Sequence, residues 1–192
     1  GSMVEVTPPV RAEPVGVALL VNTAGGFFRD GRFTGLGVER TFHVNHLSPF
    51  LGTAELVAHL REGARVVTTA SAAHRGTDLD LDRTTTLDGY SATWAYSHSK
   101  RATVLFATEL ARRLPAADRG VTSNSLHPGA IPGSGFSRFL PGPIPDLVRL
   151  LDSVPGVTSV ADGAAALLFL GVSPRTAGVS GRYFSGREPE TP

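Results

Sequence analysis

Near its start the chain reads Val15-Gly16-Val17-Ala18-Leu19-Leu20-Val21 and then Asn22-Thr23-Ala24-Gly25-Gly26. An uncharged apolar run of this length is typical of a buried strand, and the glycines after it favour a turn at the strand's end. Strands buried on both faces occur mainly in parallel sheets that helices cover. The stretch therefore predicts an α/β fold.

Further along the chain, predicted strands and helices alternate. Strands are expected near 65–70, 121–126 and 181–185. Helices are expected near 40–60 with Gly63 ending the first, near 94–114 with Pro115 as the stop, near 146–151, and at 160–170 with Ser159 as N-cap. This alternation predicts a truncated Rossmann-like doubly wound parallel sheet with flanking helices.

No second domain or internal repeat is evident. Residues 1–14 are interpreted as an extended leader that begins with a cloning remnant, Gly1-Ser2-Met3. Residues 15–192 are expected to form a single catalytic domain.

Composition excludes several functional classes. The 192 residues carry 18 basic and 17 acidic side chains without a basic run, so neither nucleic acid nor a membrane surface is an expected partner. The absence of cysteine excludes disulfides, thiolate metal sites and cysteine nucleophiles, and no metal site is expected. No signal peptide or membrane span is apparent, so a cytoplasmic location is expected.

One residue type is conspicuously rare: the basic side chains are 17 arginines and a single lysine, Lys100. An ammonium is compact, whereas a guanidinium is bulky and planar. A lone lysine in such a background therefore marks a candidate position where arginine cannot replace it. Lys100 lies four residues after Tyr96, in Tyr96-Ser97-His98-Ser99-Lys100, so both share one face of the predicted helix. A tyrosine hydroxyl titrates near 10 and needs a nearby positive charge to act as an acid-base group at neutral pH.

Five motifs in order resemble the short-chain dehydrogenase/reductase family. They are the Tyr96 to Lys100 motif, Asn22-Thr23-Ala24-Gly25, His43-Val44-Asn45-His46-Leu47, Val66 to His74, and Asn124-Ser125-Leu126-His127-Pro128-Gly129. The tail from Ala164 to Phe184 resembles the subgroup that includes retinol dehydrogenases.

This resemblance implies a role for each matching residue. Tyr96 would donate and accept the proton, Lys100 would lower the pKa of Tyr96, Ser71 would bind the substrate oxygen, and Asn45 would anchor a proton-relay water. The residues implied on the nicotinamide side, should a cofactor bind, are Asn22, Ala24, Gly25, Pro128, Gly129 and Ile131. His74 and His98 lie near these motifs and are interpreted as local polar structure rather than catalytic groups.

The family's phosphate-binding turn is missing from the sequence before Asn22. Only 21 residues precede Asn22, and they contain no Gly-x-x-x-Gly-x-Gly. Gly31, Gly35 and Gly37 have that spacing but follow the strand. Because the turn holds the pyrophosphate at a helix N-terminus, its loss removes the main anchor of the adenosine half. No cofactor is therefore expected, unless the missing half is supplied and NAD(P) binds.

Three interpretations remain open. In the first, the site performs acid-base chemistry without NAD(P) on a carbonyl or hydroxyl substrate, in an isomerisation, dehydration or cyclisation. In the second, the chain is the C-terminal part of an NAD(P)-dependent oxidoreductase of ketones or alcohols. In the third, it is a non-catalytic dimerisation partner. Phenylalanines beside the motif loops suggest a bulky apolar small-molecule substrate: Phe27, Phe28, Phe33, Phe136 and Phe139.

The first strand also bears on assembly. It carries no charge or proline that would protect an open edge, and an exposed edge of that kind favours pairing with another strand. The family resemblance further implies dimers that pack through the helices near 40–60 and 95–114. A homo-oligomer is therefore expected, and a stable monomer in light scattering at high micromolar concentration would contradict it.

Overall fold

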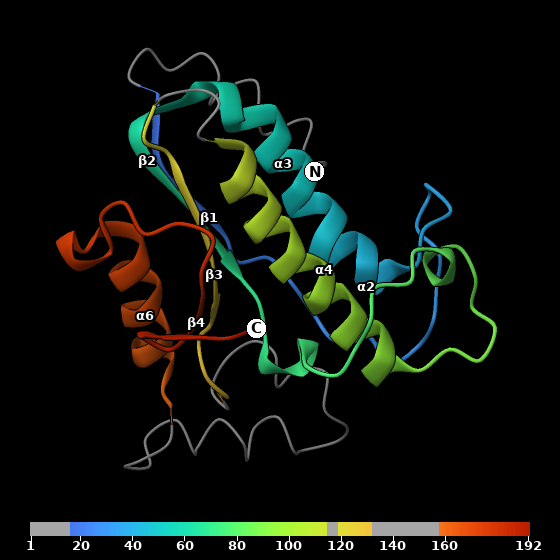
Figure 1. Ribbon diagram of the computed structural model, residues 1–192. Coiled ribbons are helices and arrows are strands. Elements are labelled where there is room, and N and C mark those ends of the chain that lie inside the picture. Colours follow the sequence, from blue (N-terminus) through green and yellow to red (C-terminus); the bar gives the residue numbers. More distant parts are fainter. Residues whose placement is uncertain (1–15, 115–118, 132–157) are drawn as a thin grey trace.

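The computed structural model describes residues 16–114, 119–131 and 158–192, and these form a five-stranded sheet between two layers of helices (Figure 1). The strands are β1 (Val17–Asn22), β2 (Leu60–Thr69), β3 (Thr122–His127), β4 (Tyr183–Ser185) and β5 (Glu188–Glu190), and they lie side by side in this order. The first four are parallel, as expected, and β5 runs antiparallel to β4. The sheet is a Rossmann-like α/β fold.

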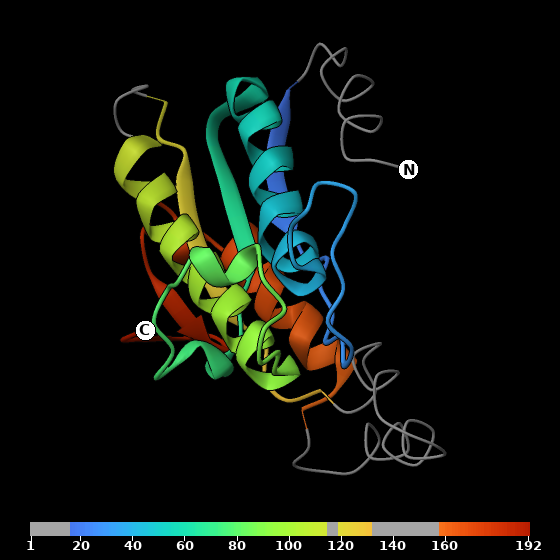
Figure 2. The same cartoon turned by 90° about the vertical axis from the view of Figure 1, so that its right-hand side faces the viewer.

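Helices cover both faces of the sheet. On one face lie α2 (Arg40–Phe42), α3 (Ser48–Leu56) and α4 (Ala92–Arg113), and on the other lies α6 (Val160–Val172) (Figures 1 and 2). The Ser91 hydroxyl caps α4 by accepting from the Trp94 amide, and Ser159 caps α6 in a reciprocal box with Asp162. The expected N-cap of the last helix is confirmed.

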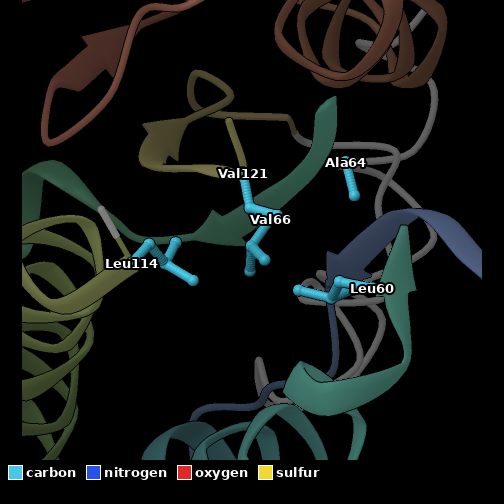
Figure 3. Packing of buried hydrophobic residues seen from close by; sticks show 5 residues of the cluster. All are labelled: Leu60, Ala64, Val66, Leu114 and Val121. Carbon is cyan, nitrogen blue, oxygen red and sulfur yellow. The ribbon is translucent and has the colours of Figure 1, made fainter. Parts of the chain in front are cut away.

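The two faces of the sheet form separate apolar layers because neighbouring residues of β2 point in opposite directions. The cluster shown in Figure 3 lies on the face of α4 and comprises Leu60, Ala64, Val66, Leu114 and Val121. The cluster under α6 comprises Val67, Leu126, Ala166, Leu170 and Phe184. Val66 and Val67 are both fully buried, which confirms that this strand is covered on both sides.

The expected helix over 40–60 is wrong in detail. It consists of α2, a widened π turn (His43–Leu47), α3 and a 3-10 turn (Val57–His59). Gly63 does not end this helix, because β2 already begins at Leu60 and Gly63 lies inside it with a positive φ of 68°. The register between β1 and β2 shifts at this point, and the irregularity requires a residue without Cβ.

Some expectations fall outside the described residues. These are the leader (1–14), the stop at Pro115, the short helix at 146–151, and Phe136 and Phe139. Within the described ranges, β1 pairs only with β2 and so forms one edge of the sheet. None of the helices in those ranges combines the length and the apolar character needed to cross a membrane.

His46 makes the stability of the helical layer sensitive to acid. Its ring packs against Phe42 and Phe106, with centroids 5.0 and 6.1 Å away, and burial lowers its pKa from 6.5 to about 4, with a further contribution from His98. The native state therefore binds fewer protons than the unfolded state between these pH values. Stability is present above pH 6.5 and is lost as the pH falls toward 4.

We expect His46→Leu to flatten this pH dependence. Between pH 6.5 and 4, both proteins should lose free energy of unfolding. The loss should be greater for the unmodified protein than for the variant, by roughly 2 kcal/mol. Denaturant unfolding at a series of pH values measures the difference. His59→Leu, which replaces a histidine outside the aromatic cluster, is the control. Parallel curves for the unmodified protein and His46→Leu would contradict the assignment.

Candidate active site

The sequence-predicted catalytic residues converge at the carboxyl end of the parallel strands. Ser71 follows β2 by two residues, and Pro128 follows β3 directly. Tyr96 and Lys100 lie in the first turns of α4, which packs against β3 and β2. Since parallel strands all end at the same edge of the sheet, the residues that follow them meet there.

Ser71 and Tyr96 form the centre of the site, where the Ser71 side chain lies close enough to Tyr96 to lower the pKa of its phenol. The Ser71 hydroxyl also accepts from the Ala73 amide at 3.2 Å, which fixes it at the start of a short 3-10 turn (Ala72–His74). Burial raises the pKa of the Tyr96 phenol above 10, and the hydrogen bond with Ser71 opposes that rise. The phenol is therefore protonated at neutral pH.

Lys100 lies behind this pair and is 4% exposed. Its Nζ donates to the Thr69 carbonyl at 2.8 Å, and burial lowers its pKa from 10.5 to about 8, so most of the population is charged at pH 7. Nζ is 5.9 Å from the centre of the Tyr96 ring. The Tyr96 pKa is raised by burial and lowered by Ser71, and an influence of Lys100 on the phenol stays a prediction.

Asn45 uses its side-chain amide to hold the site together. Nδ2 donates to the Gly26 carbonyl and to Ser99 Oγ, both at 2.9 Å, and Oδ1 accepts from the Gly26 amide at 2.8 Å. Asn45 is 1% exposed and lies in the π turn, a feature often found at functional sites. The amide thus joins the loop after β1 to α4, and the anchoring of a water by Asn45 stays a prediction.

Ser99 is a residue that the sequence analysis missed. Its hydroxyl accepts from Asn45 and donates to the Tyr96 carbonyl at 2.7 Å, and it is completely buried. Its place between Tyr96 and Lys100 was the only available signal. Phe27 was noted only as an apolar neighbour, and its ring centre lies 5.7 Å from that of Tyr96.

Comparison with known proteins agrees with this arrangement. The family model described as short chain dehydrogenase matches residues 2–138. This chain belongs to the short-chain dehydrogenase family. It is 37% identical to human retinol dehydrogenase 14 over 175 residues, which are 90% of this chain and 51% of that protein. It is 34% identical to the putative daunorubicin C-13 ketoreductase DnrU of Streptomyces sp. (strain C5), over 89% of this chain and 56% of that protein.

A solved structure shows the same fold. The short chain dehydrogenase from Burkholderia cenocepacia J2315 in complex with NADP matches with a TM-score of 0.61 and 27% identity, over 88% of this chain and 64% of that one. The chain spans about half the length of the curated relatives it matches. It therefore corresponds to part of a short-chain dehydrogenase.

The residues expected on the nicotinamide side differ in whether they leave open space or are engaged within the fold. A Cβ on Gly25 would lie 3.3 Å from Asn45 Oδ1 and 3.5 Å from Lys100 Nζ, so the glycine keeps the space in front of both open. Gly129 has a positive φ of 101°, and Ile131 packs where Gly163 has no side chain.

Asn22, by contrast, is a structural residue. Its Nδ2 donates to Thr53 Oγ1 at 3.0 Å and to Thr68 Oγ1 at 3.2 Å, which ties the end of β1 to α3 and β2. Ala24 is exposed, and Pro128 lies in the turn after β3. The amide of Asn22 is therefore already engaged within the fold.

The glycines at 31, 35 and 37 do not form a phosphate-binding turn. Thr34 and Val38 close a small turn, which brings Phe33 beside Glu39 in an antiparallel bridge. The Glu39 carboxylate accepts from the amides of Thr41 and Phe42 at 2.8 and 2.9 Å, so a negative charge already occupies the N-terminus of α2. An anionic pyrophosphate would be repelled there.

We expect Ser99→Ala to loosen the site without unfolding the protein. The change leaves the Asn45 amide short of one acceptor in a buried position, so the free energy of unfolding should fall by about 1–3 kcal/mol. Denaturant unfolding measures the loss. Ser97→Ala, on the same turn of α4 but partly exposed, is the control. Equal stability of the two variants would show that Ser99 is not part of the connection.

Proposed function

We propose that this chain carries the proton-transfer site of an oxidoreductase that acts on the carbonyl or hydroxyl group of a small apolar molecule. The observation that supports this most directly is that the Ser71 side chain lies close enough to the Tyr96 phenol to lower its pKa. Two hydroxyl groups placed in this way can both contact one substrate oxygen. Family membership and the similarity to a ketoreductase and to retinol dehydrogenases support the oxidoreductase class.

Each residue has a definite task in the proposed reduction. The Ser71 hydroxyl donates a hydrogen bond to the carbonyl oxygen of the substrate and orients it. Tyr96, protonated at neutral pH, gives its proton to that oxygen as the carbonyl becomes an alcohol. The Lys100 ammonium stabilises the phenolate that is left, because an opposite charge nearby favours the ionised form.

NAD(P) would supply the hydride when bound. Gly25, Gly129 and Ile131 would border its nicotinamide, as the space kept open at Gly25 suggests. The adenosine half would need residues beyond the described ranges. Among the described residues, only Gly31, Gly35 and Gly37 have the spacing of a phosphate-binding turn, and the Glu39 carboxylate occupies the helix N-terminus that follows them. The cofactor therefore depends on chain that is not part of the described structure.

Acid-base chemistry without NAD(P) is the second candidate. It is favoured by the fact that Ser71, Tyr96, Lys100 and Asn45 are all brought together by the described residues alone. An isomerisation, dehydration or cyclisation at a carbonyl or hydroxyl substrate would need no hydride. Phe27 beside Tyr96 would contact an apolar substrate in either case.

A homo-oligomer remains part of the proposal. The outer surfaces of α3 and α4 expose apolar side chains at Phe50, Leu51 and Leu105, and β1 is an open edge within the described sheet. Both features favour contact with a second copy.

Substitutions at Tyr96 and Lys100 test the proton transfer. Tyr96→Phe should abolish turnover of a carbonyl substrate, because it removes the hydroxyl that is proposed to give the proton. Lys100→Arg should reduce kcat at least 100-fold, since a guanidinium does not fit the compact buried space of the ammonium. Arg101→Lys, at the adjacent helix position, is the control and should keep full activity. An active Tyr96→Phe variant would end the assignment.

Titration calorimetry with NADPH and NADH separates the two candidates. If the adenosine site is supplied by another chain, the described residues would contact only the nicotinamide half of the nucleotide. We then expect dissociation constants for NADPH and NADH no tighter than the millimolar range. Turnover of a carbonyl substrate without added nucleotide would then establish the cofactor-free reaction. Micromolar binding of either nucleotide would establish the nicotinamide-dependent one.

A further inference from the structure

A buried histidine lies directly behind the proposed substrate-binding serine. His74 has no exposed surface, and its Nδ1 lies 2.6 Å from the carbonyl oxygen of Ser71. A carbonyl oxygen only accepts hydrogen bonds, so Nδ1 must carry the hydrogen. The contact therefore selects the Nδ1–H tautomer of the ring.

The backbone alone holds this turn loosely. The His74 amide donates to the Ser71 carbonyl at 3.2 Å, and the Arg75 amide donates to the Ala72 carbonyl at 3.2 Å. Both distances are at the long limit for such bonds, whereas the bond from the imidazole is short. The imidazole is thus the firmest support of the residue whose hydroxyl contacts Tyr96.

The far side of the ring faces the C-terminal strands. His74 Nε2 is buried and has no hydrogen-bond partner among the described residues, and the same is true of the Tyr183 hydroxyl on β4. The two rings meet edge to face with their centres 4.8 Å apart. Tyr183 therefore holds the far side of the His74 ring by packing.

Arg75 connects this pair to the end of the sheet. Its guanidinium lies 5.8 Å from the centre of the Tyr183 ring and forms an ion pair with Glu190 of β5. β4 and β5, which the catalytic chemistry does not otherwise use, therefore support the turn that holds Ser71.

We propose that His74 is a positioning residue: its neutral Nδ1–H ring holds the Ser71 carbonyl and thereby keeps the Ser71 hydroxyl in reach of Tyr96. The inference rests on the proposed function for its consequence in turnover, and on geometry alone for the tautomer. His74 does not touch the substrate in this account.

The surroundings of His74 oppose a positive charge on the ring. Burial lowers its pKa below 6.5, and the charges of Arg75 and Arg101 lower it further, against the effect of the hydrogen bond to Ser71. His127, on β3, is the other titratable group that interacts with it. Protonation would place a charge beside these groups, so turnover should fall in acid.

Two matched substitutions distinguish the ring nitrogens. The asparagine amide of His74→Asn can occupy the place of Nδ1 and donate to the Ser71 carbonyl, whereas the longer glutamine of His74→Gln replaces Nε2. We expect His74→Gln to lose roughly tenfold or more in kcat with little change in KM, and His74→Asn to retain most of it. The acid limb of the pH profile should disappear in His74→Asn, because an amide does not titrate. Equal activities of the two variants, both folded by circular dichroism, would overturn the proposal.

Histidine nitrogen NMR of the unmodified protein gives a readout independent of turnover. At pH 7.5 we expect the His74 signals, assigned by comparison with His74→Asn, to be those of a neutral Nδ1–H ring. An Nε2–H or charged ring would overturn the proposal. If no carbonyl substrate is turned over by the unmodified protein, the proposed function fails, and the tautomer then decides the positioning role by itself.

Discussion

The buried amide of Asn45 is the connection on which the site depends. It binds both the amide and the carbonyl of Gly26 and also the hydroxyl of Ser99, so it joins the loop after β1 to the first turns of α4. These contacts use both hydrogens of the amide and one lone pair of its oxygen. Because Ser99 lies between Tyr96 and Lys100, this side chain links both of them to the loop after β1.

Burial has opposite consequences for the two ionisable groups of the site. It makes the Tyr96 phenol harder to ionise and the Lys100 ammonium easier to deprotonate, because a low-dielectric surrounding disfavours whichever form is charged. A proton is thus held on the phenol at neutral pH, which suits donation to a carbonyl oxygen.

The sequence was sufficient for those features that depend on local pattern. The apolar run before Asn22 predicted the parallel strand β1, and the four-residue spacing of Tyr96 and Lys100 placed both on one face of α4. The expected burial of that strand is wrong among the described residues, because β1 pairs with β2 alone, its side chains are half-buried and Val21 is exposed. The family resemblance, which the family model bears out, pointed to Ser71 just after the end of β2. These inferences need only the periodicity of the chain and the edge at which parallel strands end.

Features that depend on distant partners were not predictable. The π turn around Asn45 brings that amide into hydrogen bonds with Gly26 and Ser99, and no local sequence pattern predicts the turn. Gly63 reads as a helix stop, yet it lies at an irregularity in β2 that is set by pairing with β1. His74 was interpreted as local polar structure, since its contact with Tyr183 joins segments more than 100 residues apart.

The most direct test of the account is the ionisation of Tyr96 itself. Carbon NMR of the labelled tyrosines, with the Tyr96 signal assigned through Tyr96→Phe, follows that phenol as the pH rises. The account predicts a pKa above 10 in the unmodified protein and a further rise in Ser71→Ala, because the serine opposes the effect of burial. A Tyr96 pKa below 10, or one that Ser71→Ala leaves unchanged, would contradict it.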